Sequence, residues 1–466
     1  MAHYDPSSEQ QESKSSPQQD VFEVTPQLID EISHALQEND SEQLDYLLEP
    51  LHSADVADVF EQLSGNERVE LVDYYGAEMD PEVLMELEDS ALDQVIHKMD
   101  DQHVVDAISQ MESDDAVGIL EDIDEAERDR IIAAMPSEER LVVEEALSYP
   151  EDSAGRMVQK NVITVPGSWT VGHVIKTLRA DEDLPSEFYE IFVVDPLHHP
   201  IGTVSLSRLI RAEDKTHVSE IMDSDPKVVP ASKDQEEVAY MFRQYDLTSM
   251  GVVDESGRLM GMITVDDVVD VINEEAQEDI MRMAGIQETD ITETIFEASR
   301  NRIVWLLVNL LTAILASMVI AIFDGTIQQM VALAILMPIV ASMGGNAGTQ
   351  TMTVAVRALA TRDLTSSNVR RVIGKEFSIS LLIGLVMAVI IGVLTSLYFS
   401  NVALGGVIAV AMVINMVCAG LSGILVPVGL EKMNIDPALA SSIFVTTITD
   451  VIGFYAFLGL ASITLL

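Results

Sequence analysis

One carboxylate of this chain stands where a carboxylate is costly. In "SSIFVTTITDVIGF", Asp450 lies near the middle of an apolar stretch, with the hydroxyls of Thr446, Thr447 and Thr449 within one helical turn. Acids inside apolar spans usually face a substrate route, a proton relay or an ion. No Lys or Arg stands at comparable depth to pair with Asp450. Carboxylate and hydroxyl oxygens are hard ligands, which suit magnesium or calcium better than a soft metal.

A second polar run interrupts an apolar stretch at "MPIVASMGGNAGTQTMTV", residues 337–354. Pro338 cannot donate a backbone hydrogen bond, so a carbonyl four residues earlier loses its usual partner. The run contains the glycines Gly344, Gly345 and Gly348 and the polar residues Asn346, Thr349 and Gln350. The glycines alone are consistent with tight helix packing. The polar residues among them favour a polar path, because backbone polarity at membrane depth is tolerated only inside protein or beside water.

These residues belong to a series of five apolar stretches, each close to the roughly 20 residues that cross a bilayer. The stretches cover about 302–323, 327–350, 377–399, 404–429 and 438–462. We therefore expect a five-helix transmembrane domain over residues 301–466. Lys and Arg are absent from 324–326 and 400–403 but concentrated in 357–376, which predicts cytosolic N-terminal domains and an external C-terminus in the cell membrane.

Charge is divided sharply between the two parts of the chain. The 300 residues before the spans hold 71 of the 77 acids and 19 of the 26 Lys and Arg, a net charge of −52. Such a field repels nucleic acid and attracts cations. Adaptation to a saline habitat would explain the same excess. The single cysteine, Cys418, excludes an internal disulfide, and residues 1–20 have no signal-peptide pattern and are expected to be a disordered tail.

Residues 21–150 repeat a short amphipathic pattern. "VADVFEQL" at Val56, "VVDAISQM" at Val104 and "AVGILEDI" at Ala116 each place apolar residues at helical spacing. Short helices stacked in a superhelix fit this pattern best.

Residues 151–275 contain a longer repeat that predicts strand, helix, hairpin and helix in each copy. It resembles a tandem pair of CBS domains. The adenine-nucleotide signature of that family matches Gly261, Thr264 and Asp267 in the second copy, so ATP or a related nucleotide is a candidate ligand. In the first copy Ser205 and Arg208 replace the Thr and Asp of the signature. His198 and His199, in the hairpin turn of the first copy, are expected to be surface residues rather than ligands.

The segment after the second copy is unusually acidic and leads, as a connecting helix over residues 276–300, to the first span. Its acids recur every three or four residues, so several share one helix face, where like charges repel unless a cation neutralises them. They are Asp267, Asp270, Glu274, Glu275, Glu278 and Asp279.

Helical superhelix, CBS pair, acidic helix and five spans together resemble the MgtE family of magnesium channels. The motifs that match are "YPEDSAGRMV", "DQEEVA", "TVDDVVDV", "MPIVASMGGNAGTQ" and "TTITDVIGF". The resemblance implies a homodimer in the lipid bilayer, with one pore lined by the second and fifth spans. It places Asp450 and Asn346 in the pore, with Thr446 and Gly345 beside them.

The resemblance also implies regulatory magnesium sites in the cytosolic part. Their residues would be Asp114, Asp234, Glu236, Asp246, Asp267, Asp270, Glu275, Glu278 and Asp279. Gly118 stands where a second acid beside Asp114 is expected. Bound Mg²⁺ would remove the repulsion between facing carboxylates and close the pore.

Two other functions remain open at this point. A proton-coupled divalent-cation transporter could use Asp450 as its proton carrier. A membrane-bound adenine-nucleotide sensor without transport would leave Asp450 unexplained. The sequence has no phosphate loop and no constellation of nucleophile and base, so an enzyme is not expected.

Overall fold

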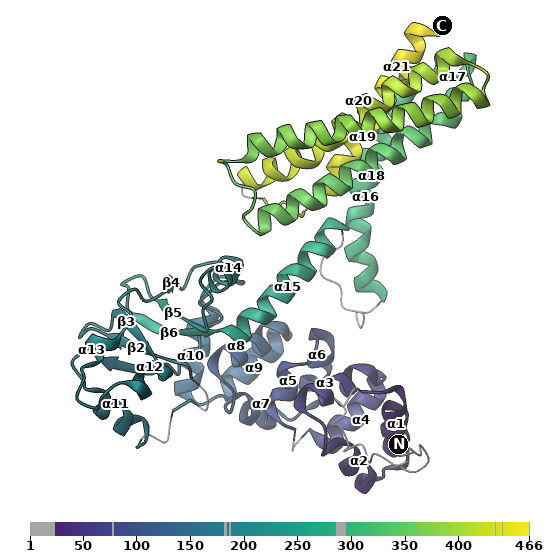
Figure 1. The fold of residues 1–466 in the computed structure, drawn as a ribbon. Helices are drawn as coiled ribbons and strands as arrows, with labels where there is room; N and C mark the ends of the chain where they lie inside the picture. The colour runs from purple at the N-terminus through teal and green to yellow at the C-terminus, as the bar shows by residue number, and fades with distance from the viewer. Residues whose placement is uncertain are drawn as a thin grey trace, which may run out of the picture. The chain divides into compact units, whose positions relative to one another are not determined.

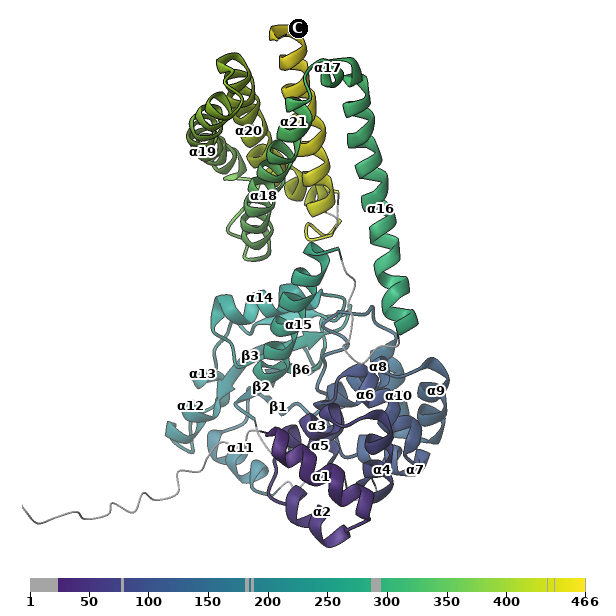
Figure 2. The same ribbon diagram turned by 90° about the vertical axis from the view of Figure 1, so that its right-hand side faces the viewer.

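The structure is a computed structural model of the 466-residue chain. It describes residues 24–76, 79–180, 184–185, 188–285, 295–433, 435–439 and 441–465. The predicted disordered tail, residues 1–20, lies outside the described residues, as does part of the predicted connecting helix, residues 286–294. The chain forms two compact units, and the boundary along the chain falls between Val268 and Val269. Figures 1 and 2 show the fold within each unit.

Short helices follow one another at the start of the first unit, as the repeated pattern predicts, and they share one apolar core that includes Phe60 and Leu120. Local sequence explains their ends. Thr25 caps the first helix ahead of Pro26, and Asp100 caps α7 by accepting from Gln102 N. The helices are α1 (Pro26–Glu38), α2 (Ser41–Leu48), α3 (Ser53–Gln62), α4 (Gly65–Tyr75), α5 (Pro81–Met85), α6 (Asp89–Lys98), α7 (Asp101–Ile108), α8 (Ser113–Asp122), α9 (Glu125–Ala134) and α10 (Ser137–Leu147).

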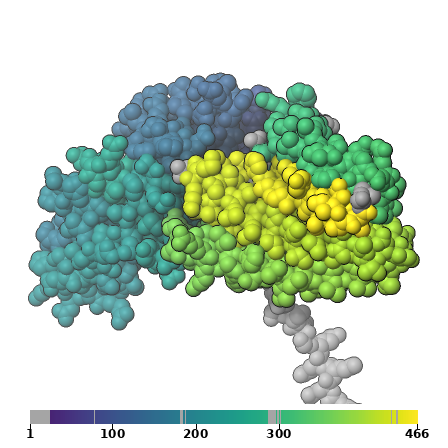
Figure 3. Space-filling model, turned by 90° about the horizontal axis from the view of Figure 1, so that it is seen from above, coloured from purple at the N-terminus to yellow at the C-terminus, as the bar shows by residue number. Residues whose placement is uncertain are grey.

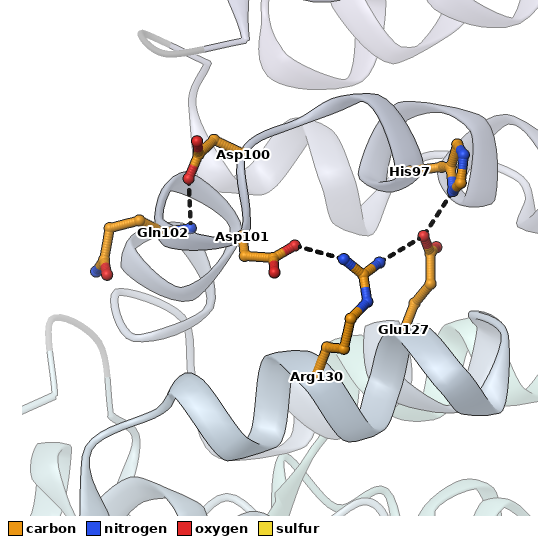
Figure 4. A network of polar contacts seen from close by, with 6 residues as sticks. All are labelled: His97, Asp100, Asp101, Gln102, Glu127 and Arg130. Atoms are coloured by element: carbon orange, nitrogen blue, oxygen red, sulfur yellow. Dashed lines mark hydrogen bonds and ion pairs between the residues drawn. The ribbon is translucent and has the colours of Figure 1, made fainter.

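A polar network joins α6, α7 and α9 within this array (Figure 4). Glu127 is buried and accepts from Arg130 at 2.8 Å, and His97 Nδ1 lies 2.6 Å from the same oxygen. Arg130 also contacts Asp101 at 3.0 Å. The network therefore links α9 to α7 through Arg130 and to α6 through Glu127.

The CBS-like repeat forms two small sheets with the same topology. In the first, β1 (Thr164–Pro166) pairs parallel with β2 (Glu190–Val194), which pairs antiparallel with β3 (Pro200–Ser205). In the second, β4 (Val228–Pro230), β5 (Ser249–Val253) and β6 (Leu259–Thr264) repeat this arrangement. The helices are α11 (Val171–Leu178), α12 (Leu206–Arg211), α13 (Val218–Ile221), α14 (Gln235–Tyr245) and the start of α15 (Val265–Met283). The predicted order of strand, helix, hairpin and helix is therefore confirmed in both copies.

The hairpin turns of the two copies contact each other. His199 lies 3.2 Å from Ser256 O across the copies, and Leu259 N donates to His198 O. His198 is exposed and His199 is half-buried against Asp195. The two histidines therefore join the turns to each other, and the prediction that they are surface residues holds for His198 and in part for His199.

The second unit contains the rest of α15 and the apolar helices. Its five long helices are each long and apolar enough to cross a bilayer. The helices are α16 (Ile295–Ile322), α17 (Asp324–Gln329), α18 (Ala332–Ala360), α19 (Val369–Tyr398), α20 (Val402–Lys432) and α21 (Ser441–Thr464). Helix α20 extends beyond its predicted stretch at both ends, α19 begins earlier than predicted, and α18 continues ten residues past its predicted end. Helices α18 and α21 begin later than predicted, and the residues before α18 form a short helix of their own.

Helix α20 is the centre of this unit. It packs against α18, α19 and α21, while α16 packs on α21. Leu336, Ile408 and Phe457 come from three of these helices and form part of one buried core. Gly423 allows α18 and α20 to touch, because a Cβ there would lie 2.8 Å from Gly348 O. Figure 3 shows that α21, in yellow, keeps one side exposed in this single chain.

Candidate functional site

The glycine run of α18 is helical throughout, and its glycines face different neighbours. A Cβ at Gly344 would lie 2.2 Å from the side-chain nitrogen of Asn415, and one at Gly348 would lie 2.5 Å from Val445. Both glycines therefore serve close packing. Gly345 is different, because the nearest atom to its Cβ position is the Thr446 methyl at 3.8 Å. The packing interpretation applies to two glycines, and the third lies beside a predicted pore residue.

Asp450 and Thr446 are four residues apart on α21 and therefore share a face. Asp450 is half-buried, and within the described parts of the chain its carboxylate has neither a hydrogen bond nor an ion pair. The Thr446 hydroxyl donates to the carbonyls of Ser442 and Ile443, which leaves its oxygen free to accept or coordinate. Thr449 is fully buried, so it is the predicted hydroxyl least able to reach an ion.

A polar stripe runs along the outward face of α18. Asn346, Gln350 and Thr353 are exposed, and Thr349 is half-buried between them. An exposed amide is costly in hydrocarbon, so this face requires either a protein partner or water. Gly345 lies next to the stripe and joins it to Thr446 of α21.

A cavity of about 390 Å³ opens at the end of α21 where the polypeptide enters that helix. Arg282 and Trp305 line it from α15 and α16, and Ser442 and Thr446 line it from α21. The same Thr446 therefore borders both Gly345 and a space large enough for several waters.

An acidic cluster in the first unit lies where α8 begins. Oxygens of Glu112, Asp114 and Asp115 lie within 4.8 Å of one another, close enough to hold one metal ion. Asp114 is buried, and its Oδ1 has no hydrogen-bond partner among the described residues. Asp267, from the start of α15, adds a fourth negative charge to the group.

The electrostatics of this cluster are those of crowded like charges. Burial, then the carboxylates of Asp115 and Asp267, raise the pKa of Glu112 to about 7. Burial and then Asp267 raise the pKa of Asp114 well above its usual range. Glu112 and Asp114 therefore resist ionisation beside their acidic neighbours, and a divalent cation bound there would favour the ionised form of both.

A second acidic group lies within the second unit, on α15 and the loop before α21. Burial, then Asp436 and Glu275, raise the pKa of Asp279 to about 6. Arg282 contacts both Asp436, at 2.5 Å, and Glu278. One guanidinium thus partly neutralises this group, whereas none of the described bases pairs with Glu112 or Asp114.

Other predicted regulatory residues are not brought together. Asp234 caps the start of α14 and accepts from Glu236 N at 2.9 Å, while Asp246 caps its end with a left-handed φ of 51°. An 11-residue helix separates its ends by about 16 Å, so these acids cannot share an ion within one chain. Asp270 is exposed on α15. The regulatory role of these residues stays a prediction.

The predicted nucleotide signature has other roles in this structure. A Cβ at Gly261 would lie 2.3 Å from Gln159 O, so the glycine admits a neighbouring backbone. Asp267 accepts from the hydroxyl of Thr264 at 2.6 Å and from its N–H. In the first copy, Arg208 donates to Ile221 O instead.

Four residues described here are not among the predicted site residues. Glu112 and Asp115 flank Asp114, and a one-turn window around that acid would have found them. Asp436 is the acid of "NIDPA", the turn that leads into the last span. Asn415 is the one amide in the middle of the fourth apolar stretch, and its depth was the available signal.

The fold and these sites define a multi-pass membrane protein with a soluble unit built from a helical array and a CBS pair. Models of three families match the chain: the MgtE divalent cation transporter over residues 337–460, the MgtE intracellular N domain over 51–152, and the CBS domain over 154–215 and 218–274. The chain belongs to the MgtE family, as the resemblance in its sequence implies.

Two relatives agree with this membership, and one solved structure is similar to part of the chain. Magnesium transporter MgtE of Thermus thermophilus is 32% identical over 444 residues, or 93% of this chain and 98% of the relative. Magnesium transporter MgtE of Bacillus subtilis is 29% identical over 417 residues, or 89% and 92%. A crystal structure of the cytosolic domain of the Mg²⁺ channel MgtE in complex with ATP is 33% identical, covers 52% of this chain and 99% of that one, and has a TM-score of 0.48.

Proposed function

We propose that this protein is a magnesium channel that mediates Mg²⁺ uptake and is closed by Mg²⁺ on its cytosolic side. The observation that carries the proposal is the Asp450 carboxylate, half-buried at membrane depth and without a partner among the described residues. Relatives of the chain named as magnesium transporters support the choice of ion.

The ion path runs along α18 and α21 of two subunits. Asn346 and Gln350 support this, since their exposed amides need a partner or water at membrane depth. In a homodimer each subunit supplies one Asp450, with Thr446 and Gly345 beside it. Magnesium releases its water reluctantly, so one carboxylate per subunit holds it with much of its water shell in place.

Closure is driven by the acids of the soluble unit and of α15. Two like charges 4 Å apart near a protein surface repel by about 4 kcal/mol, which is comparable with the free energy that separates two channel states. Mg²⁺ bound at Glu112, Asp114 and Asp115, and between Asp279 and Asp436, removes this repulsion and favours the closed state. The predicted acids Asp234, Glu236, Asp246, Asp267, Asp270, Glu275 and Glu278 belong to the same proposed sensor.

An adenine nucleotide such as ATP is proposed as a further ligand of the second CBS copy. Its candidate residues, Gly261, Thr264 and Asp267, include one that also belongs to the acidic cluster. Nucleotide and Mg²⁺ would therefore influence each other through Asp267. The soluble unit faces the cytosol and the C-terminus lies outside. The basic residues at the end of α18 and at the start of α19 support this orientation.

The test is Mg²⁺ flux through the purified full chain in liposomes. A current that follows the Mg²⁺ gradient and ignores a pH gradient is the expected result. Current that reverses with the pH gradient would establish the rival, a proton-coupled transporter that uses Asp450. Absence of any flux, with nucleotide binding intact, would favour a sensor.

A separate measurement addresses closure. Protease accessibility of the segment 270–300 should fall as Mg²⁺ rises through the millimolar range. An unchanged cleavage pattern across that range would reject the gating proposal and leave the conduction proposal standing.

A further inference from the structure

Asn415 is a fully buried amide in the middle of α20, the central helix of the membrane unit. Its Nδ2 donates to Val340 O of α18 at 2.7 Å. The nitrogen must face Val340 because a carbonyl only accepts. The Asn415 Oδ1 is buried, and it has no hydrogen-bond partner within the described chain. An amide that satisfies one end only is a poor choice for stability, because an apolar side chain would fill the space without this cost.

Two glycines from different helices make the space for this amide. A Cβ at Gly344 of α18 would lie 2.2 Å from Asn415 Nδ2, and a Cβ at Gly453 of α21 would lie 2.9 Å from the same atom. Real Cβ atoms do not approach so closely, so the amide fits only because both positions are glycine. Asn415 is thus a wedge from α20 held between α18 and α21.

The wedge is next to the proposed ion path on both sides. On α18, Gly344 is followed directly by Gly345 and Asn346. On α21, Gly453 comes one helical turn after Asp450. A change in the thickness of the wedge would therefore shift Gly345 and Asn346 relative to Asp450. Asn415 lies behind the path and is not one of its lining residues.

We propose that Asn415 is a positioning residue that sets the spacing between α18 and α21 and so determines how well the path discriminates Mg²⁺ from Ca²⁺. This inference rests on the proposed function. Oxygen ligands lie at about 2.0–2.1 Å from Mg²⁺ and about 2.3–2.6 Å from Ca²⁺, so displacements of a fraction of an ångström distinguish the two ions. The tie from Nδ2 to the α18 backbone fixes this spacing more firmly than apolar contact would.

The experiment compares Mg²⁺ and Ca²⁺ flux through full-length chain in liposomes. Flux of the unmodified chain is measured first, and no Mg²⁺ flux there rejects the proposed function itself. Asn415→Leu removes the tie at similar volume, and the ratio of Mg²⁺ to Ca²⁺ flux should fall by roughly tenfold, because misplacements near 1 Å cost this much or more. An unchanged ratio in a variant that reconstitutes and melts like the original overturns the inference.

Ser380→Ala is the matched control. Ser380 of α19 is buried over Gly420 of α20, as Asn415 is over Gly344, but it contacts neither α18 nor α21 in the described contacts. Its flux ratio should stay within about twofold of the original, since distant sites act independently. An equal loss of selectivity in Ser380→Ala would mean that any packing defect has this effect, and it would overturn the inference.

A second variant decides the matter if Asn415→Leu fails to reconstitute. Gly453→Ala adds a Cβ into the amide and should lower the flux ratio in the same direction. Asn415→Ala removes the obstacle, so adding Gly453→Ala to it should have little further effect. Additive losses from the two changes would show that Asn415 and Gly453 do not act through one contact.

Discussion

The acid inside the last span and the acids at the start of α8 are arranged in opposite ways. Asp450 has no hydrogen bond or ion pair within the described chain, whereas Glu112, Asp114 and Asp115 crowd together, and burial with the neighbouring acids raises the pKa of Glu112 and of Asp114. A lone carboxylate offers an ion one fixed ligand and lets it leave, as conduction requires. Crowded carboxylates favour a cation that stays, as a sensor requires. Under the proposed function, the same ion is therefore conducted at Asp450 and sensed at the acidic cluster of α8.

The largest effect should come from removing the lone carboxylate. We expect Asp450→Ala to lower Mg²⁺ flux in liposomes by roughly 100-fold, the upper range for loss of a group that supports a metal site. Asp363→Asn, which neutralises an exposed acid in the loop after α18, should leave the flux unchanged. Substantial flux through Asp450→Ala would break the comparison, because the lone acid would then be dispensable.

Neutralising the crowded cluster should instead leave conduction active and remove its control. For Glu112→Gln combined with Asp114→Asn, we expect the Mg²⁺ concentration that half-closes the channel to rise by roughly tenfold. Glu125→Gln with Asp129→Asn makes the same charge change at exposed positions of α9 and should not shift it. The measurement is flux against cytosolic-side Mg²⁺. Equal shifts in both double variants would show that only total charge matters.

Adding a carboxylate to the cluster should sharpen the response. Gly118 lies one turn after Asp114 on α8, and a Cβ there would meet no atom within 4 Å. We expect Gly118→Asp to lower the half-closing Mg²⁺ concentration by roughly a few-fold, which is less than the roughly tenfold or greater cost of losing one supporting group. Gly118→Ala tests whether the added side chain alone has any effect. A shift in both variants would assign the effect to helix stability.

The smallest effect should be a pH dependence of magnesium binding. The pKa of Glu112 is raised to about 7, so the folded metal-free chain gains stability as pH falls through 7 and Glu112 takes up its proton. Mg²⁺ competes with that proton. The rise in melting temperature caused by Mg²⁺ should therefore be smaller at pH 6 than at pH 8, and Glu112→Gln should reduce the difference. Equal rises at both pH values would contradict a cation site at Glu112.

The sequence predicted the order of helices and strands well, because the spacing of apolar residues along the chain indicates each type of element. The CBS repeats showed the same pattern twice, and five apolar stretches of sufficient length can hardly be anything but spans. The sequence could not predict the separate roles of Gly344, Gly345 and Gly348, because these roles depend on neighbours that only the structure shows. The acidic cluster was only half found: the family resemblance named Asp114 and Asp267 but not Glu112, because an acid at a helix start looks solvated in the sequence and only the structure shows it half-buried near Asp267.

The contact between Gly348 and Gly423 has a mechanical consequence. Where two helices touch backbone to backbone, neither can roll about its own axis without a collision, because no flexible side chain lies between them. Helices α18 and α20 should therefore travel as one stiff block when the protein changes state. Helix α16 is more able to slide, because in the described chain it packs chiefly on α21.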